Sequence, residues 1–305
     1  MASASKDRLL GFASCALAST LWGTGFFFGK IALREMNVGA MVFYRFVFAA
    51  LALLPFLFTH RAEFRGKEWG ILLLGTFLGI PVQFLVQFTG LSLTTVSHAS
   101  LMVGTMPVIL ALGAVAFAHE RLRALGWICL VISTLGAGMI ALGAKHHVDG
   151  GPTISGDLLV VLSLAIALGW ILLNKKLLET HSAITVTSYG VIAGTLMLAL
   201  VVPPMYGMPP VHGISLKAWS ALAASGVLCT AATTLTWNWG MTKVPASQAG
   251  ILLNMEPLMG SILGVVILHE TLGVLAYIGG TMILVAAVTL TTQHGDATVT
   301  DPAVI

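Results

Sequence analysis

The stretch from Gly90 to Leu122 reads GLSLTTVSHASLMVGTMPVILALGAVAFAHERL, and it recurs from Gly240 to Leu272 as GMTKVPASQAGILLNMEPLMGSILGVVILHETL. The two copies align without a gap at a constant offset of 150 residues. The matched pairs include Gly90 with Gly240, Ser97 with Ser247, Ala99 with Ala249, Pro107 with Pro257, Val115 with Val265, His119 with His269, Glu120 with Glu270 and Leu122 with Leu272. Apolar matches arise by chance in so hydrophobic a chain, but a proline and a His-Glu pair in register indicate an internal duplication.

The composition is that of a membrane protein. Of the 305 residues, 57% are hydrophobic and 9% are charged, whereas soluble domains carry about 25% charged residues. Backbone groups in lipid must bond internally, so the spans are helices or a closed barrel, and continuous rather than alternating apolar runs exclude a barrel. The net charge of +3, with basic residues in short clusters between the apolar runs, gives no indication of nucleic-acid binding.

Ten apolar segments are each about 20 residues long, which is the length that crosses a bilayer. They cover residues 9–29, 39–59, 68–89, 95–118, 123–143, 155–175, 183–203, 217–239, 246–268 and 273–293. The sequence therefore predicts an all-α integral membrane protein with ten transmembrane helices. The longest polar break divides them into a first five-helix repeat (1–145), a linker (146–154), a second repeat (155–293) and a disordered cytoplasmic tail (294–305).

The basic residues predict the orientation, because cytoplasmic loops are enriched in Lys and Arg. The side of the N-terminus holds Lys6, Arg8, Arg61, Arg65, Lys67, Arg121, Arg123, Lys175, Lys176 and Lys243, and the other side holds Lys30, Arg34, Lys145 and Lys217. Both termini are therefore expected in the cytoplasm, and the protein in the inner (plasma) membrane. Because five is an odd number of helices, the second repeat must lie inverted relative to the first, an arrangement typical of secondary transporters.

The chain resembles the drug/metabolite transporter superfamily of the EamA type. The residues that carry the resemblance are Trp22-Gly23 and Lys30 in the first span, Arg45 in the second, Pro107 and Glu120 around the fourth, and Glu256-Pro257-Leu258 and Glu270 around the ninth. The resemblance implies a ten-helix transporter with spans 1, 3, 4, 6, 8 and 9 near a central cavity, and the amino-acid exporters of the YddG type are the preferred neighbours. The second half departs at the seventh span, where Arg45 has no counterpart, which weakens any role that requires two symmetric arginines.

The expected function is secondary transport, in which small metabolites leave the cell by alternating access through a cavity between the repeats. Amino acids with aromatic or other apolar side chains are the preferred substrates, and multidrug or other metabolite efflux is the alternative. An intramembrane enzyme is a distant alternative, because no catalytic spacing occurs. We expect a small-molecule substrate and the lipid bilayer as partners, and no cofactor, catalytic residue, metal site or nucleic acid; the oligomeric state stays open.

Polar and aromatic side chains within the spans are the candidates for the cavity wall, because polar groups at membrane depth face a cavity or another helix. They are Trp22, Gln83, Gln87, His98, Met102, Trp170, Trp237, Asn238, Asn254 and Glu256. Gln83 and Gln87 lie one turn apart on one helical face, and a tryptophan can stack on an apolar substrate. The alternative for each is packing, either as a hydrogen bond between helices or as an interfacial aromatic.

Two charged residues at membrane depth leave two interpretations open. Glu256 lies about ten residues into its span, where a charge is costly and marks a functional candidate. It is either a substrate or proton site, or a neutral or paired carboxyl that fixes helix packing. Arg45 either binds a substrate carboxylate as a fork or makes a structural pair.

The remaining candidates lie near helix ends or at helix breaks. The gating or helix-end residues are Lys30, Arg45, His119, Glu120, His269 and Glu270. Pro81, Pro107 and Pro257 are expected as hinges, because proline removes a helical hydrogen bond. The Gly75-xxx-Gly79 spacing predicts close packing of the third span against another helix.

Overall fold

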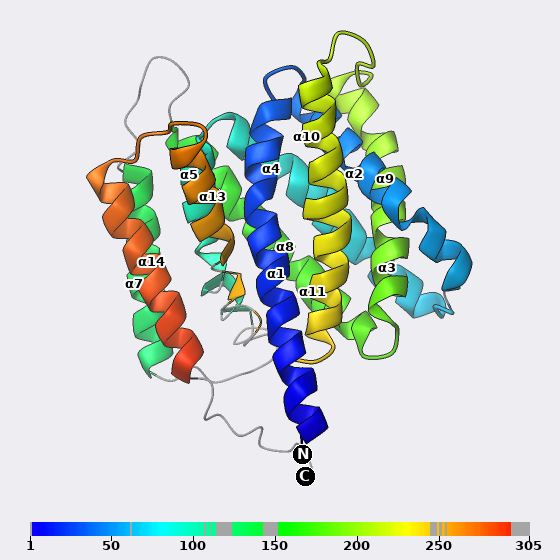
Figure 1. Ribbon diagram of the computed structural model, residues 1–305, viewed down its shortest axis with the longest axis horizontal. Coiled ribbons are helices and arrows are strands. Elements are labelled where there is room, and N and C mark those ends of the chain that lie inside the picture. The colour runs from blue at the N-terminus through cyan, green and yellow to red at the C-terminus, as the bar shows by residue number, and fades with distance from the viewer. Residues whose placement is uncertain are drawn as a thin grey trace.

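The computed structural model describes residues 2–61, 63–106, 108–110, 112–113, 124–142, 152–244, 249, 252–253 and 255–293. Within them the chain is helical apart from short connections, and the helices form a single bundle (Figure 1). The elements are α1 (Ala2–Ala32), α2 (Val38–Thr59), α3 (Gly66–Phe77), η1 (Leu78–Val82), α4 (Gln83–Ser92), α5 (Val96–Val103), α7 (Ala124–Leu142), α8 (Ile154–Leu178), α9 (Ala183–Tyr206), α10 (Leu216–Gly226), η2 (Val227–Ala232), α11 (Thr233–Met241), α13 (Met255–Val266) and α14 (Val274–Gln293).

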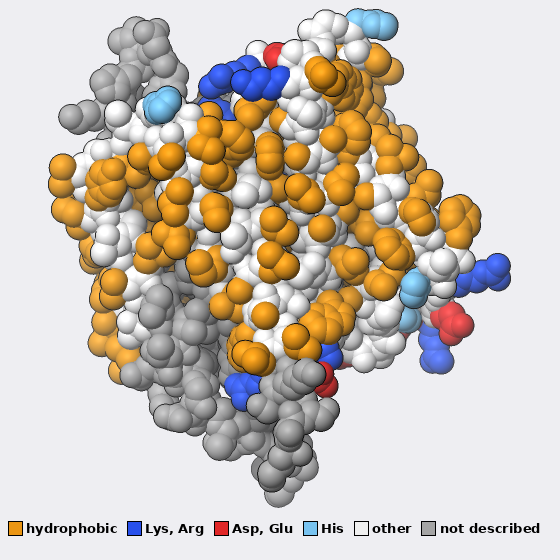
Figure 2. Space-filling model, viewed as in Figure 1, with side chains coloured by type: hydrophobic (Ala, Val, Ile, Leu, Met, Phe, Trp, Pro, Cys, Tyr) orange, Lys and Arg blue, Asp and Glu red, His pale blue; other side chains and the backbone are white. Residues whose placement is uncertain are grey.

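The described helices coincide with the ten predicted spans. Six are long and apolar enough to cross a membrane: Asp7–Ala32, Val38–Thr59, Gly66–Ser92, Ile154–Leu178, Ala183–Tyr206 and Leu216–Met241. Shorter apolar helices fall in the other four spans: Val96–Val103, Trp127–Ile140, Met255–Val266 and Val274–Ala286. Figure 2 shows hydrophobic side chains over the middle of one face, with Lys and Arg near its upper and lower ends. The prediction of an all-α membrane protein is confirmed for the described part of the chain.

Two spans are less regular than the sequence predicts. The fourth was expected as one helix over 95–118, but α5 ends at Val103 and a turn follows at Gly104 and Thr105. Glycine is a poor helix former, and a Cβ on Gly104 would lie 2.6 Å from Cγ2 of Ile283 in α14. In the ninth span, expected over 246–268, the described residues 249 and 252 are helical, a turn lies at 253, and α13 begins at Met255. Pro257 therefore falls in the first turn of α13, where its missing N–H is tolerated.

Polar contacts define the two ends of the bundle. At one end Asp7 Oδ1 lies 4.0 Å from Lys243 Nζ, and we call this the Asp7 end. At the other end Lys30 Nζ donates a hydrogen bond to the carbonyl oxygen of Thr94 at 2.5 Å, and we call this the Lys30 end. Helix α1 runs from the first end to the second.

The first helices of the two repeats run in opposite directions. Helix α8 begins at the Lys30 end, where Asp157 Oδ1 accepts a hydrogen bond from Thr94 Oγ1 at 2.7 Å. The chain leaving α8 reaches the Asp7 end, where His181 Nε2 lies 3.2 Å from Glu68 Oε1 at the start of α3. Because α1 runs the other way, the second repeat is inverted, as the odd number of helices predicts.

The two repeats interleave. Helix α1 packs against α10, α11 and α13 of the second repeat, and α8 packs against α3, α4 and α5 of the first. Helices α7 and α14 pack chiefly against each other, at one edge of the bundle in Figure 1. The space at the centre is therefore bounded by helices from both repeats.

Two long helices change from α to π winding at corresponding positions. The π segments are η1 in the third span and η2 in the eighth. Pro81 lies inside η1, where its missing N–H interrupts the α pattern. No proline lies in η2, where Thr230 Oγ1 instead donates to the carbonyl of Ser225 at 3.0 Å. Such π turns occur frequently at functional sites, and the hinge role of Pro81 stays a prediction.

Candidate functional site

A cavity lies between the two repeats, with about 1010 Å³ of space not filled by atoms, part of it open to solvent. Its wall includes residues from α1, α2, α4, α8, α9, α11, α13 and both π segments. The sequence-predicted residues in the wall are Trp22, Gln83, Gln87, Trp170, Trp237, Asn238 and Glu256, and Arg45 lies there as well. Their role in substrate binding stays a prediction, but the fold brings them around one space.

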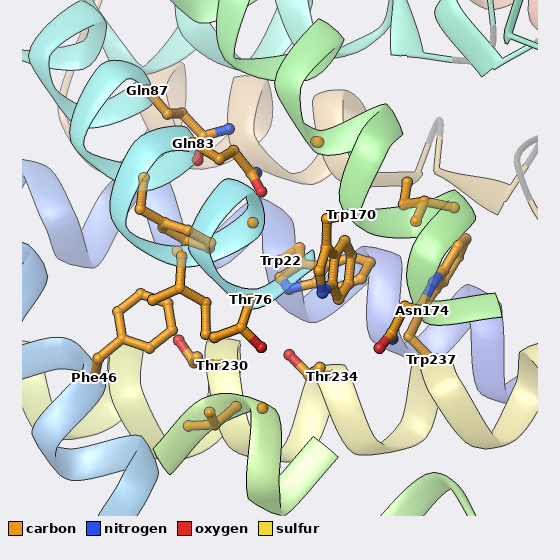
Figure 3. A pocket seen from close by; sticks show the side chains of 18 of the residues that line it. Trp22, Phe46, Thr76, Gln83, Gln87, Trp170, Asn174, Thr230, Thr234 and Trp237 are labelled. Atoms are coloured by element: carbon orange, nitrogen blue, oxygen red, sulfur yellow. The ribbon is translucent and has the colours of Figure 1, made fainter. Parts of the chain in front are cut away.

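Tryptophans from three helices meet at this cavity. The ring centroids of Trp22 and Trp237 lie 5.3 Å apart, with the planes tilted by 52°. Figure 3 shows Gln83 and Gln87 entering from α4, Thr230 and Thr234 entering from the opposite side, and the rings of Trp22 and Trp170 between them. The cavity therefore has an aromatic middle, with amide and hydroxyl groups on two sides of a largely apolar wall.

The position of Trp170 depends on a glycine in η1. A Cβ on Gly79 would overlap the indole ring of Trp170, and a Cβ on Gly75 would lie 3.3 Å from Cβ of Leu173. Both glycines face α8, as their spacing predicts. The glycine at 79 lets Trp170 pack closely against η1 while it still borders the cavity.

Gly79→Ala should push the Trp170 ring out of its place and reduce transport several-fold, while the protein still inserts. The reason is steric, because the new methyl group would occupy space that the ring now fills. Gly138→Ala is the control, because its Cβ meets no atom within 4 Å. Transport by purified, reconstituted variants is the measurement, and wild-type rates for Gly79→Ala would contradict this account of the aromatic wall.

Arg45 projects from the middle of α2, not from a helix end. Its Nε donates to Thr230 Oγ1 at 2.7 Å and its Nη2 to the carbonyl of Cys229 at 3.0 Å. Phe84 and Phe88 lie beside it, with ring centroids 4.9 Å and 5.2 Å from Cζ. Arg45 therefore ties α2 of the first repeat to the π turn η2 of the second.

Glu256 lies in the first turn of α13 and borders the cavity. A Cβ on Gly23 of α1 would lie 2.5 Å from the carbonyl oxygen of Glu256. The glycine thus allows α1 and α13 to touch directly, and it follows Trp22 in sequence. The carboxylate and the tryptophan wall are held together by this close crossing.

A chain of amide and hydroxyl groups joins three helices at the cavity. Asn174 Nδ2 of α8 donates to Asn238 Oδ1 of α11 at 2.8 Å, and Asn238 Nδ2 donates to Thr187 Oγ1 of α9 at 2.8 Å. All three residues line the cavity. The bonds use the amide of Asn238 as a bridge, and no described residue donates to the side-chain oxygen of Asn174, which can accept a further hydrogen bond.

His98 and Met102 are buried in α5 and are not among the residues that line the cavity. His98 Nδ1 lies 3.2 Å from Asp157 Oδ2, and the other carboxylate oxygen of Asp157 accepts from Thr94. His98 therefore belongs to a buried cluster at the Lys30 end. We predicted His98 in the cavity wall from the sequence because no local pattern links it to its partner Asp157, which lies 59 residues away.

Lys30 and Glu270 both bind the connection between α4 and α5. Lys30 Nζ donates to the carbonyl of Leu91 at 2.9 Å, in addition to its bond to Thr94. Glu270 accepts from the backbone N–H of Val96 at 2.9 Å and of Ser97 at 2.8 Å. The lysine meets the carboxyl end of α4 and the glutamate meets the amino end of α5, the terminus that each charge favours. His269 precedes Glu270 with a positive φ of 55°.

A second contact between the repeats closes the same end. Glu35, after α1, accepts from the backbone N–H of Ser215 at 2.7 Å and from its hydroxyl at 2.6 Å, just before α10. The Ser215 hydroxyl and then its backbone N–H lower the pKa of the Glu35 carboxyl, which lies outside the spans. At neutral pH Glu35 is therefore a carboxylate acceptor.

Four candidates lie outside the described residues: Pro107, His119, Glu120 and Asn254. Pro257 is described and is buried near the start of α13, and its hinge role stays a prediction. In the described part of the chain, no three His, Cys, Asp or Glu side chains lie together in a way that could hold a metal ion.

Sequence reasoning missed several residues that the structure makes prominent. Asp157 carried a usable signal, because it is a lone acidic residue near the start of an apolar span. Asn174 carried a weaker one near the end of the same span. Thr230 and Gly25 had none, because single hydroxyls and glycines are common in membrane helices.

Comparison with known proteins identifies the family. Residues 9–142 and 154–292 each match the EamA-like transporter family, once in each repeat. The chain belongs to this family. The match confirms the resemblance to EamA-type transporters, and the protein is a membrane transporter and not an enzyme.

The relatives agree with this assignment. An "Uncharacterized transporter" of Archaeoglobus fulgidus is 28% identical over 296 residues, covering 95% of this chain and 99% of that protein. The "Biotin transporter" of Escherichia coli (strain K12) is 25% identical over 274 residues, covering 89% of each. A solved crystal structure matches with a TM-score of 0.69 and 18% identity, covering 96% of this chain and 99% of that one, which shows the shared fold.

Proposed function

We propose that this EamA-family protein is a secondary transporter that exports amino acids with aromatic or other apolar side chains. Substrate would pass through the cavity between the inverted repeats by alternating access, because two similar inverted halves give two states of similar energy that face opposite sides. The observation that carries the proposal is the cavity wall, which combines one cation, one carboxylate and a group of tryptophans.

Each part of that wall has a counterpart in such a substrate. Arg45 and the carboxyl group of Glu256 border the same space. An amino acid carries one carboxylate and one ammonium group, which the guanidinium and an ionised Glu256 would match. Trp22, Trp170 and Trp237 offer ring faces to an apolar side chain, and a tryptophan face also attracts an ammonium group. Gln83 and Gln87 add hydrogen-bonding groups that do not depend on charge.

A second candidate is a small organic acid without an ammonium group. It is favoured by the relatives named biotin transporters and by Arg45, which makes no ion pair within 4.0 Å among the described residues. Efflux of chemically diverse drugs is the third candidate, supported by the apolar surface of the cavity alone.

A counterflow assay with purified protein in liposomes separates these candidates. Labelled phenylalanine, leucine and biotin, together with a labelled hydrophobic cation, would each be tested against an excess of the unlabelled compound inside. We expect exchange of phenylalanine and leucine. Exchange of biotin without the amino acids would favour the organic-acid candidate, and exchange of the cation alone would favour drug efflux. Efflux from preloaded cells would then give the direction.

The proposed location is the inner membrane, with both termini in the cytoplasm. The Asp7 end, which includes Arg65 and Lys243, would then face the cytoplasm under the rule for Lys and Arg. In a variant without Cys15, Cys129 and Cys229, an impermeant thiol reagent added outside should label Gly150→Cys but not Gly66→Cys. The opposite labelling pattern would reverse the proposed orientation.

A further inference from the structure

Arg45 is a cation inside the protein without a direct counter-anion among the described residues. It is 2% exposed, and no carboxylate oxygen of the described chain lies within 4.0 Å of its nitrogens. A charge removed from water is costly unless it is paired. Its hydrogen-bond partners are neutral acceptors, and aromatic rings lie beside it. The carboxyl group of Glu256 interacts with it electrostatically, but from beyond 4.0 Å.

The guanidinium of Arg45 is fixed in one orientation. Its two hydrogen bonds go to neighbouring residues of η2, Cys229 and Thr230, and so occupy the edge formed by Nε and Nη2. Phe84 and Phe88 of α4 pack beside it. Nη1 donates to no described residue, so the free donors of the fork are gathered at its Nη1 end.

Gly25 of α1 places no side chain against that end. A Cβ at this position would lie 3.4 Å from Nη2 and 3.5 Å from Nη1 of Arg45, and both residues border the cavity. Gly25 of α1 contacts the π segment η2 at Cys229. In the other repeat, Trp170 of α8 contacts the π segment η1 at Gly79. One side of the cavity is thus filled by an indole ring, while on the other side a guanidinium lies against a residue without a side chain.

We propose that Arg45 and Gly25 form a carboxylate subsite within the cavity. The Nη1 end of the guanidinium binds the carboxylate of the transported compound, and the missing side chain at Gly25 admits it. A planar fork of donors is suited to a carboxylate, which accepts two parallel hydrogen bonds. The subsite rests on the proposed function in taking the cavity as the substrate pathway, but it requires only a carboxylate and not an amino acid.

Equilibrium binding to the purified protein in lipid nanodiscs tests the subsite without requiring transport. The probes are 3-phenylpropionate and 3-phenylpropionamide, which share the aromatic ring and stem and differ in the charge of the head group. The wild-type protein should bind the acid at least about tenfold more tightly than the amide, the effect expected of a hydrogen bond between charged groups.

Two variants remove the subsite in different ways. Arg45→Gln should reduce the ratio of acid to amide affinity to about one. Because Arg45 also holds η2, this variant can lose stability, so Gly25→Ala is tested beside it. Its methyl group stands at ordinary contact distance from Arg45, so the protein should fold, and the ratio should fall several-fold as the fork is covered. Gly138→Ala, which meets no atom within 4 Å, should keep the wild-type ratio.

Each result has one consequence. Equal affinity of the wild type for acid and amide, or a ratio that survives Arg45→Gln, overturns the carboxylate subsite. If the ratio of acid to amide affinity is unchanged in Gly25→Ala, the carboxylate does not approach Arg45 past Gly25. If liposomes show no exchange of phenylalanine but the ratio depends on Arg45, the subsite stands and the amino-acid proposal fails. If liposomes do exchange phenylalanine but the ratio of acid to amide affinity does not depend on Arg45, the amino-acid proposal stands and the subsite fails.

Discussion

Glu256→Gln should reduce exchange of phenylalanine by at least about tenfold, because the variant loses a charge-assisted contact with the ammonium group. Glutamine keeps the shape and the hydrogen-bonding capacity of the side chain, so α13 and its crossing with α1 at Gly23 should be unchanged. The loss should be confined to substrates that carry an ammonium group. Binding of 3-phenylpropionate, which has none, should be affected much less. Counterflow in liposomes and binding in nanodiscs are the two measurements.

Glu179→Gln is the matched control for that variant. It makes the same chemical change at an exposed carboxylate just after α8, outside the cavity wall, and should transport at the wild-type rate. If Glu256→Gln also transports phenylalanine normally, Glu256 serves the packing of α13, which is the other interpretation that the sequence leaves open. Loss of pH dependence with retained transport would instead indicate that Glu256 carries a coupled proton.

The sequence was sufficient for the architecture because the relevant signals are long or repeated. Spans of about 20 apolar residues are set by bilayer thickness, and the aligned proline and His-Glu pair required two related halves. An odd number of helices then forced the inversion, without any knowledge of packing. The π turn at Pro81 also had a local signal, whereas η2, which contains no proline, had none.

The candidate site was only partly predictable, because its geometry depends on contacts between distant residues. Trp22 and Trp237 could be selected as polar-tipped aromatics, but their 5.3 Å approach depends on how α1 packs against α11. The importance of Gly25 depends on its contact with Arg45 of α2, which no pattern in the sequence predicts. Residue type gave the chemistry of the wall, and the fold decided which side chains share it.

The Lys30 end shows the same limit for a cluster of charges. Lys30 and Glu270 were selected as helix-end residues, and each binds one side of the α4–α5 connection. Their contacts span 61 and 174 residues of sequence, so no local pattern could pair them. Together with Asp157 of α8, they join α1, α8 and the connection between α13 and α14 to one turn. If alternating access opens this end, these are the contacts that must separate.

Asp157 is the member of this cluster whose loss should cost the most stability. It is 1% exposed, as is Thr94, and His98 is 2% exposed. Asp157→Leu leaves the hydroxyl of Thr94 and Nδ1 of His98 buried without their partner. Each orphaned polar group costs about 1–3 kcal/mol, so the loss of a partner for both should lower the free energy of unfolding by roughly 2–6 kcal/mol. Asp157→Asn retains an oxygen that accepts from Thr94 and should cost less.

Thermal unfolding of the detergent-purified protein measures this effect directly, because a thiol-reactive dye reports exposure of the buried free cysteines Cys15, Cys129 and Cys229. Asp157→Leu should lower the melting temperature by at least roughly 5 °C. Asp7→Leu is the control, since its side chain is 58% exposed and lies 4.0 Å from its cationic partner, where an ion pair contributes little. A melting temperature for Asp157→Leu equal to that of Asp7→Leu would mean that the buried cluster does not stabilise the Lys30 end, and that the closure there depends on Lys30, Glu35 and Glu270 alone.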